Sequence, residues 1–252
     1  MYSHSLSSVL MLLALSSCAQ DTLPIEDRKE KIKVMESNAT RASLERRTRS
    51  VARLKSEGVP VIEHLPPIED VRDVKRRTKE EIAWRAMALL LVAVKGEGLE
   101  QPIVDKIVKD YGLDGQFTPN EAVFVQQQSP TTHDRIQFAW RYEAAWTLLW
   151  SLGYVESLGK PTEICDVPRA VKFLHERTSS HFISDSNLRP IEEILDEADL
   201  IYRYHWAVVD ARINGKQAPA SLEPGVTIER HHALNWLIGY MDQEWDDIST
   251  DT

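Results

Sequence analysis

The chain has 252 residues, of which 42% are hydrophobic and 27% are charged. This composition can supply a large hydrophobic core, so it excludes a chain that is disordered throughout. The formal net charge of −9 argues against a nucleic-acid-binding protein, because such proteins present basic surfaces to the phosphate backbone.

The first eighteen residues have the pattern of a bacterial lipoprotein leader. An apolar run from Val9 to Leu15 is followed by Ser16, Ser17 and Cys18, which resembles a lipobox, although no Lys or Arg precedes the run. We therefore expect residues 1–17 to be a signal peptide and Cys18 to be the first mature residue, diacylated and anchored stably in the membrane. The expected location is the bacterial cell envelope. A secretory leader without lipidation, or a cytoplasmic protein if the leader is not used, are the alternatives.

The next segments are polar or extended. Residues 18–40 are expected to form a polar tether, and a polar helix follows that ends near Gly58. Basic residues are concentrated between residues 26 and 57, and we favour a solvated helix or tether over a segment that lies on anionic headgroups. Residues 59–67 contain Pro60, Pro66 and Pro67, which excludes a helix and predicts an extended strap across the domain.

Helix start and stop signals recur through the rest of the chain, without the alternation typical of strands. Thr78 and Glu81 form a capping box ahead of an apolar helix that stops near Gly96. Further helices are expected over residues 99–111, 119–127, 132–152, 166–176 and 190–214, and from residue 225 onward. The sequence therefore predicts an all-α protein, with a single compact multi-helix domain over residues 41–252 and a proline-rich extended strap near its N-terminus.

Charged residues on apolar helix faces are the most informative positions. The expected helix over residues 132–152 is apolar nearly all round, yet it carries Arg141 and Glu143, and Arg85 similarly interrupts an apolar helix. In the helix after Pro190, a 3-4 spacing places His205 and Arg212 on the stripe that faces the core or a cleft. Because an isolated buried ion is unfavourable by several kcal/mol, these groups should pair with opposite charges or line a wet pocket.

Acidic partners for these arginines occur late in the chain, among them Asp210 and Glu229. We favour a buried network of arginines, carboxylates and tryptophans over a cleft in which arginines bind a carboxylate or phosphate ligand. Asp199 and Arg203 are four residues apart and are expected to pair at the surface.

Motifs for metal or covalent chemistry are weak. Glu229 and His232 form one E-x-x-H pair, whereas di-metal carboxylate bundles use two, so no metal and no cofactor are expected. Cys165 precedes a helix start that could lower the pKa of its thiol, but a small core thiol is the interpretation that we favour. The chain contains neither a nucleophile elbow nor a phosphate-binding loop.

Several segments carry these charges, some of them together with tryptophan or histidine, namely residues 85–98, 138–144, 164–167, 204–212, 229–237 and 245–247. Together they resemble the DUF4272 family, a mostly bacterial family of unknown function. The resemblance covers residues 41–252 and implies one helical domain without implying a reaction. Many members of that family lack a leader, so the lipobox of this chain would be a departure from a cytoplasmic norm. The resemblance and the charges on apolar faces indicate the same residues: Arg85, Arg141, Glu143, His205, Asp210, Arg212, Glu229, Arg230, His232 and Asn235.

We therefore expect a membrane-tethered helical interaction or ligand-binding module, whose charged core fixes its packing. Its partners would be the membrane, through the lipid anchor, and a protein or a small anionic ligand. The alternative is a hydrolase-like enzyme in which His205 or His232 acts as the base, oriented by Glu143 or Glu229.

Overall fold

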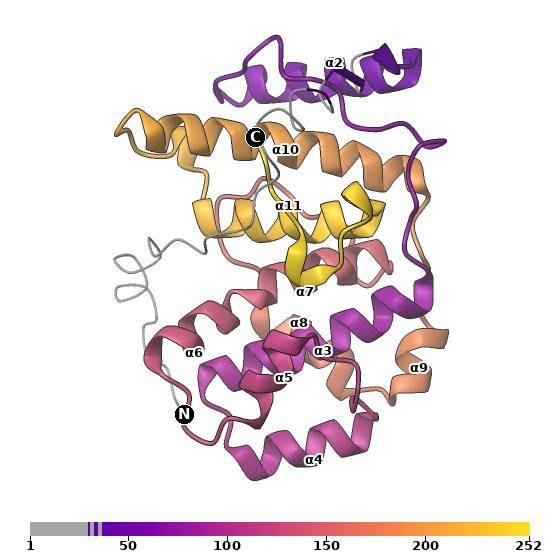
Figure 1. The fold of residues 1–252 in the computed structure, drawn as a ribbon, viewed down its shortest axis with the longest axis vertical. Coiled ribbons are helices and arrows are strands. Elements are labelled where there is room, and N and C mark those ends of the chain that lie inside the picture. Colours follow the sequence, from indigo (N-terminus) through magenta and orange to yellow (C-terminus); the bar gives the residue numbers. More distant parts are fainter. Residues whose placement is uncertain (1–29, 31–32, 35–36) are drawn as a thin grey trace.

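The computed structural model describes residues 30, 33–34 and 37–252, and this part of the chain contains helices and no strand (Figure 1). The predicted all-α fold is confirmed. The expected signal peptide, the lipidation site at Cys18 and most of the tether over residues 18–40 lie outside the described residues. None of the helices in the described part is both long enough and apolar enough to cross a membrane.

Five helices stack in layers along the long axis of the molecule (Figure 1). The layers follow in the order α2 (Arg41–Ser56), α10 (Ile191–Ile213), α11 (Pro224–Ile238), α7 (Arg141–Ser151) and α3 (Lys79–Glu97). Helices α3 and α7 are apolar on nearly all sides and almost completely buried, as expected for the centre of a helical domain.

The other helices pack around this stack. Helices α4 (Gln101–Tyr111), α5 (Pro119–Gln126) and α6 (Thr132–Ala139) contact α3, and α8 (Val167–His175) and α9 (Ser179–Ser184) also reach it. Short 3-10 helices follow at Pro219–Ser221 (η3), Tyr240–Asp242 (η4) and Trp245–Asp247 (η5). The last two belong to the C-terminal segment, residues 239–252, which returns toward α11 and α5.

Local signals set most helix ends as predicted. The Thr78 side chain accepts from the backbone of Glu81, whose carboxylate accepts from the backbone of Thr78, so the expected capping box is present. Helix α3 ends at Gly98, two residues beyond the predicted stop near Gly96; the φ of 110° at Gly98 is a conformation that glycine adopts without strain. Asp166 caps α8 through the backbone N–H of Arg169.

The prediction of a single helix over residues 132–152 is wrong, because the helix is interrupted at Trp140, which separates α6 from α7. A Cβ added at Gly96 of α3 would lie 2.7 Å from the backbone nitrogen of Ala139, so α6 crosses α3 in backbone contact. On the other side, the ring of Trp140 occupies the space above Gly225. The bend lets α6 cross Gly96 while α7 packs on both α3 and α11. Helix α9 was not predicted either.

The proline-rich strap is non-helical, as predicted, and its residues 65–68 are buried. Arg203 of α10 donates to the carbonyls of Leu65 and Pro66 at 3.4 and 3.1 Å. Arg203 also pairs with Asp199 at 2.7 Å, and the two side chains are 3% and 0% exposed. The expected Asp199–Arg203 pair therefore exists, but its predicted surface position is wrong, because the strap covers it.

Candidate functional site

Two arginines of the central helices pair with glutamates. Arg85 of α3 donates to Glu121 of α5, and both side chains are buried. Arg141 of α7 donates through Nη1 to both carboxylate oxygens of Glu229 in α11, at 2.8 and 3.0 Å. The side chains of this second pair are 27% and 12% exposed. The pair therefore lies where the interior meets solvent.

Glu143 of α7 connects α11 with the loop before α8. It accepts from the backbone N–H of Cys165, and its Oε2 lies 3.5 Å from Nε of Arg230 in α11. Arg230 also donates to the carbonyls of Leu158 and Gly159 at 2.9 and 3.0 Å. Burial raises the pKa of Glu143, against the opposing effects of Arg230 and the Cys165 N–H. These contacts hold α7, α11 and the loop before α8 together.

Cys165 is a buried core thiol. Burial, followed by the nearby carboxylate of Glu143, raises the pKa of the thiol, and Sγ lies 3.7 Å from the carbonyl oxygen of Tyr142. The start of α8 does not offset these effects. The core interpretation of Cys165 is thus supported, and the possibility of a lowered thiol pKa is contradicted.

The C-terminal segment inserts a tryptophan into a group of polar side chains that we call the Trp245 cluster: Arg85, Glu121, His232, Trp236 and Trp245. The ring of Trp245 lies 5.2 Å from the guanidinium carbon of Arg85, and 4.7 and 5.3 Å from the ring centroids of His232 and Trp236. The segment is held in place by Asn235 of α11, whose side-chain amide donates to the carbonyl of Ser249 at 2.9 Å.

Each member of the Trp245 cluster has a buried polar atom without a hydrogen-bond partner among the described residues. These atoms are Nε of Arg85, Oε1 of Glu121, Nε2 of His232 and the indole nitrogens of Trp236 and Trp245. Folded proteins leave few such groups, so five on neighbouring side chains are unusual. Three of them are fixed donors, one is a fixed acceptor, and the role of the His232 nitrogen depends on its tautomer.

His232 is neutral near physiological pH. Burial and the nearby charge of Arg141 lower the pKa of His232 to about 3, against the opposing effect of the Trp245 backbone. Arg85 is already paired with Glu121. The Trp245 cluster therefore carries no net charge, but it has an excess of buried donors, which suits a ligand with acceptor oxygens.

His205 of α10 meets His231 of α11 rather than a carboxylate. Their Nδ1 atoms are 2.8 Å apart, so one ring must donate and the other must accept. Burial and the charge of Arg212 lower the pKa of His205 to about 4, and burial lowers that of His231 well below its usual value. This pair is a contact inside the α10–α11 interface, which the sequence did not indicate for His231.

The last predicted residues lie near the C-terminal end of α10. Asp210 accepts from the side-chain amide of Asn214 at 3.2 Å, one turn further along. Arg212 is exposed, so its predicted place in the core or a cleft is wrong. The end of α10 projects beyond the core that covers its middle, since the neighbouring Ile213 is 76% exposed.

The structure thus brings Arg85 and His232 together, with Arg141 and Glu229 beside them. Sequence reasoning missed Glu121, Trp236 and Trp245 as members of this site. Glu121 had an evident local role, because it completes the capping box of α5 with Thr118; nothing in the sequence shows that its carboxylate also reaches Arg85. Trp245 was noted only as part of the family resemblance.

The described residues hold no group of three or more His, Cys, Asp or Glu side chains that could bind a metal ion. A hollow of about 310 Å³ lies elsewhere, between α4 and α5, and shares no residue with the Trp245 cluster.

The fold and this site define a class of protein: an all-α domain whose charged side chains are paired inside a helical stack. The family model DUF4272, a domain of unknown function, matches residues 46–248, so the chain belongs to this family. The resemblance noted in the sequence is thereby confirmed. No curated protein and no solved structure matches the chain.

Proposed function

We propose that this chain is a membrane-tethered helical binding module, and that it holds a small ligand with acceptor oxygens, such as a carboxylate or phosphate, at the Trp245 cluster. The observation that carries the proposal is the set of five buried polar atoms without partners on the neighbouring side chains of this cluster. Sites for small molecules combine apolar walls with a few convergent polar groups. The donors of Arg85, Trp236 and Trp245 fit that description.

The position of the Trp245 cluster also supports a ligand site. The charge of Arg141 acts on the imidazole of His232, and the Arg141–Glu229 pair is partly exposed. A path from solvent would therefore pass this pair. The C-terminal segment, which carries Trp245, would have to move away from α11 for a ligand to enter.

The geometry gives less support to the hydrolase alternative. A histidine base needs an orienting acid and access to substrate. Among the described contacts, His205 pairs with His231, while Glu143 and Glu229 are engaged by arginines. No His–Glu pair of the expected kind is present in the described part of the chain.

The ligand proposal can be tested with inorganic phosphate and malonate, using glycerol as an uncharged control, on the purified domain. We expect the oxyanions, but not glycerol, to raise the melting temperature and to change tryptophan emission. Trp245→Phe, which keeps an aromatic ring but removes the indole donor, should weaken this response several-fold. Trp206→Phe, in α10 outside the cluster, is the matched control and should respond like the wild type.

Two results would refute the ligand proposal. One is the absence of a response to either oxyanion at millimolar concentration. The other is an equal response in the Trp245→Phe and wild-type proteins, which would place binding elsewhere.

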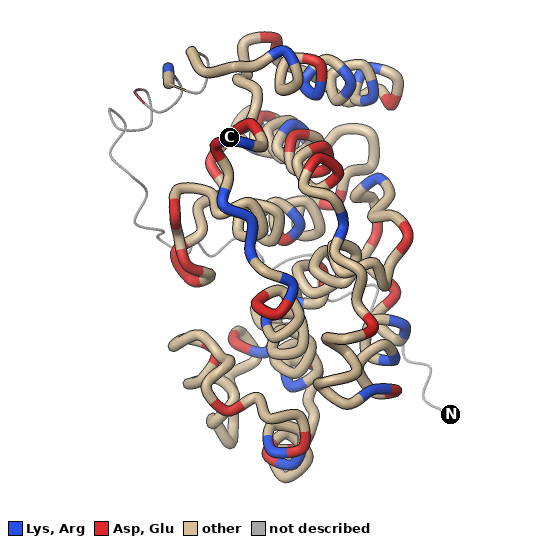
Figure 2. Tube along the Cα trace, turned by 90° about the vertical axis from the view of Figure 1, so that its right-hand side faces the viewer, with Lys and Arg blue, Asp and Glu red and all other residues tan. Residues whose placement is uncertain are grey.

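The tether is the second part of the proposal. It rests on the lipobox pattern that ends at Cys18. Helix α2, which follows the expected tether, forms one end of the helical stack and carries several arginines (Figures 1 and 2). In a bacterial host, a clickable fatty acid should label the wild type and Cys165→Ala, but not Cys18→Ala. Equal labelling of all three proteins, or no labelling of the wild type, would end this part of the proposal.

A further inference from the structure

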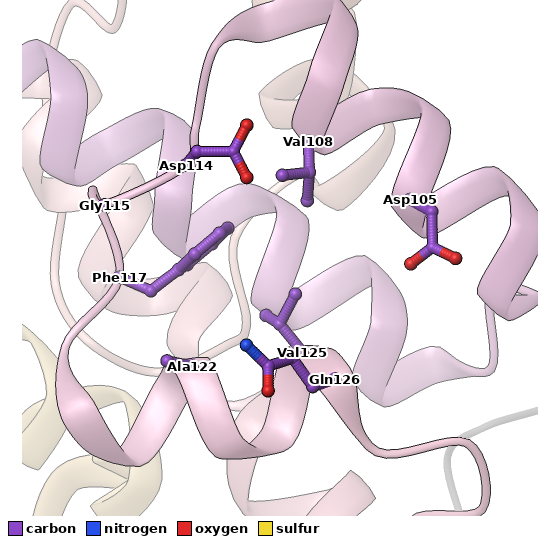
Figure 3. A pocket seen from close by; sticks show the side chains of 8 residues that line it. All are labelled: Asp105, Val108, Asp114, Gly115, Phe117, Ala122, Val125 and Gln126. Atoms are coloured by element: carbon purple, nitrogen blue, oxygen red, sulfur yellow. The ribbon is translucent and has the colours of Figure 1, made fainter.

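The hollow between α4 and α5 has the size of a small-molecule site. Both helices pack on α3, and the space that they leave has a volume of about 310 Å³, near the lower end for such pockets. The residues that line it are Asp105, Val108, Asp114, Gly115, Phe117, Ala122, Val125 and Gln126 (Figure 3).

The inner wall of the hollow is apolar. Val108 comes from α4, Ala122 and Val125 come from α5, and Phe117 comes from the loop between them. Figure 3 shows the ring of Phe117 pointing into the space between the two helices. Phe117 and Val108 are only half-buried. A ligand with an apolar body would cover them, and the aromatic ring is a favourable neighbour for a cation.

The rim of the hollow is acidic. Asp105 and Asp114 are exposed, and Figure 3 shows Asp114 beside Phe117, with Asp105 farther along α4. Asp105 accepts from the side-chain amide of Gln101 at 2.7 Å. Within the described part of the chain, neither carboxylate forms an ion pair, because the α4 lysine at position 106 pairs with Asp110 instead.

Lys95 of α3 lies behind the wall of the hollow and does not neutralise the rim. Its Nζ donates to the carbonyls of Val125 and Gln127 at 2.7 and 2.8 Å, and to the side chain of Gln101. Burial lowers the pKa of Lys95, and the charge of Asp105 opposes this effect. The ammonium group of Lys95 is thus engaged by carbonyl and amide oxygens behind the wall and not by Asp114.

We propose that this hollow binds a small amphipathic amine, with the apolar body against Val108, Phe117 and Val125 and the ammonium group beside Asp114, while Asp105 adds negative charge farther along the rim. Charge complementarity selects this ligand, because an anion would be repelled by both carboxylates and a neutral ligand would form no ion pair with them. The inference does not depend on the oxyanion site, since the two sites share no residue.

The test uses three probes of the same shape: 4-phenylbutylamine, 4-phenylbutan-1-ol and 4-phenylbutyrate, titrated into the purified domain by NMR. The amine should bind most tightly, the alcohol more weakly and the carboxylate least. Asp114→Asn should weaken binding of the amine about two- to fivefold, the range for a screened ion pair, and should leave the affinity for the alcohol unchanged. Ala122→Leu, which fills the hollow, should remove binding of both.

Glu163→Gln is the matched control, because it removes one exposed surface carboxylate outside the hollow and should leave all three affinities unchanged. The proposal is overturned if the alcohol binds as tightly as the amine, or if Asp114→Asn behaves like Glu163→Gln. It is also overturned if no resonance of the lining residues shifts at an amine concentration of about 10 mM, which corresponds to the weakest dissociation constant of interest. Because Trp245→Phe leaves this hollow intact, loss of oxyanion binding in that variant does not alter these outcomes.

Discussion

The Asp199–Arg203 pair and the Trp245 cluster both bury charged side chains, but they differ in how completely their hydrogen bonds are made. Every guanidinium nitrogen of Arg203 has a partner, on Asp199 or on the strap carbonyls of Leu65 and Pro66. The Trp245 cluster leaves five enclosed polar atoms without one. A completely bonded polar network makes a structure rigid and specific, whereas a buried polar group without a partner is unfavourable until a ligand or water satisfies it. Burial of charged side chains alone therefore does not distinguish a structural ion pair from a candidate binding site.

The largest effect should come from breaking the completely bonded region. Arg203→Ala leaves Asp199 buried without a partner and frees the strap, so we expect a loss of about 3–5 kcal/mol in the free energy of unfolding, measured by urea denaturation. Arg49→Ala is the control, because Arg49 is an exposed arginine that pairs with Asp196 at 2.7 Å, and it should change stability by less than about 1 kcal/mol. Equal losses in the two variants would contradict the importance of the buried pair.

The His205–His231 contact should produce the next largest effect, through pH. The pKa of His205 is about 4 in the folded protein, against 6.5 as its ordinary value. As the pH falls below 6.5, the imidazole of His205 takes up a proton in the unfolded chain but stays neutral in the folded protein. The free energy of unfolding therefore falls until the pH reaches about 4. One such group contributes a slope of at most about 1.4 kcal/mol per pH unit.

His205→Gln should therefore flatten the dependence of unfolding free energy on pH between 6.5 and 4. The exposed His133 provides the control, and His133→Gln should leave the slope as in the wild type. An unchanged slope in His205→Gln would show that His205 takes up its proton equally readily in both states.

The smallest effect should come from a polar atom that has no partner. Trp245→Phe removes an enclosed N–H while keeping a ring, so the lost contact area and the relieved donor should nearly cancel, within about 1 kcal/mol. Trp245→Ala removes the ring as well and should destabilise the protein by about 3–5 kcal/mol. A loss above 2 kcal/mol in Trp245→Phe would mean that the indole nitrogen forms a bond important for the fold.

Sequence reasoning predicted the features of the fold that depend on neighbouring residues. The capping box at Thr78 and the end of α4 at Gly112 involve a few consecutive residues, and the structure has them. Helix α3 ends at Gly98, two residues beyond the predicted stop near Gly96. The break at Trp140 was not predictable in this way. It accompanies the approach of Ala139 to Gly96, a contact between residues more than forty positions apart.

The candidate site shows the same limit. An apolar helix face indicated that Glu143 would need a partner, and it has one in Arg230. The same argument failed for Arg212, because periodicity does not show where the covering helix ends. It also placed the Asp199–Arg203 pair at the surface, since the strap that buries it comes from the other end of the chain.

The contacts of the strap and of α2 also determine when these segments can fold. Arg46 of α2 reaches Asp196 at a sequence separation of 150 residues, and Arg203 reaches Leu65 across 138. At a synthesis rate of roughly 5–20 residues per second, α10 follows α2 by about 8 to 30 seconds. Closing so long a segment of chain is also slow. The first helix of the domain to be synthesised is therefore among the last to reach its final position.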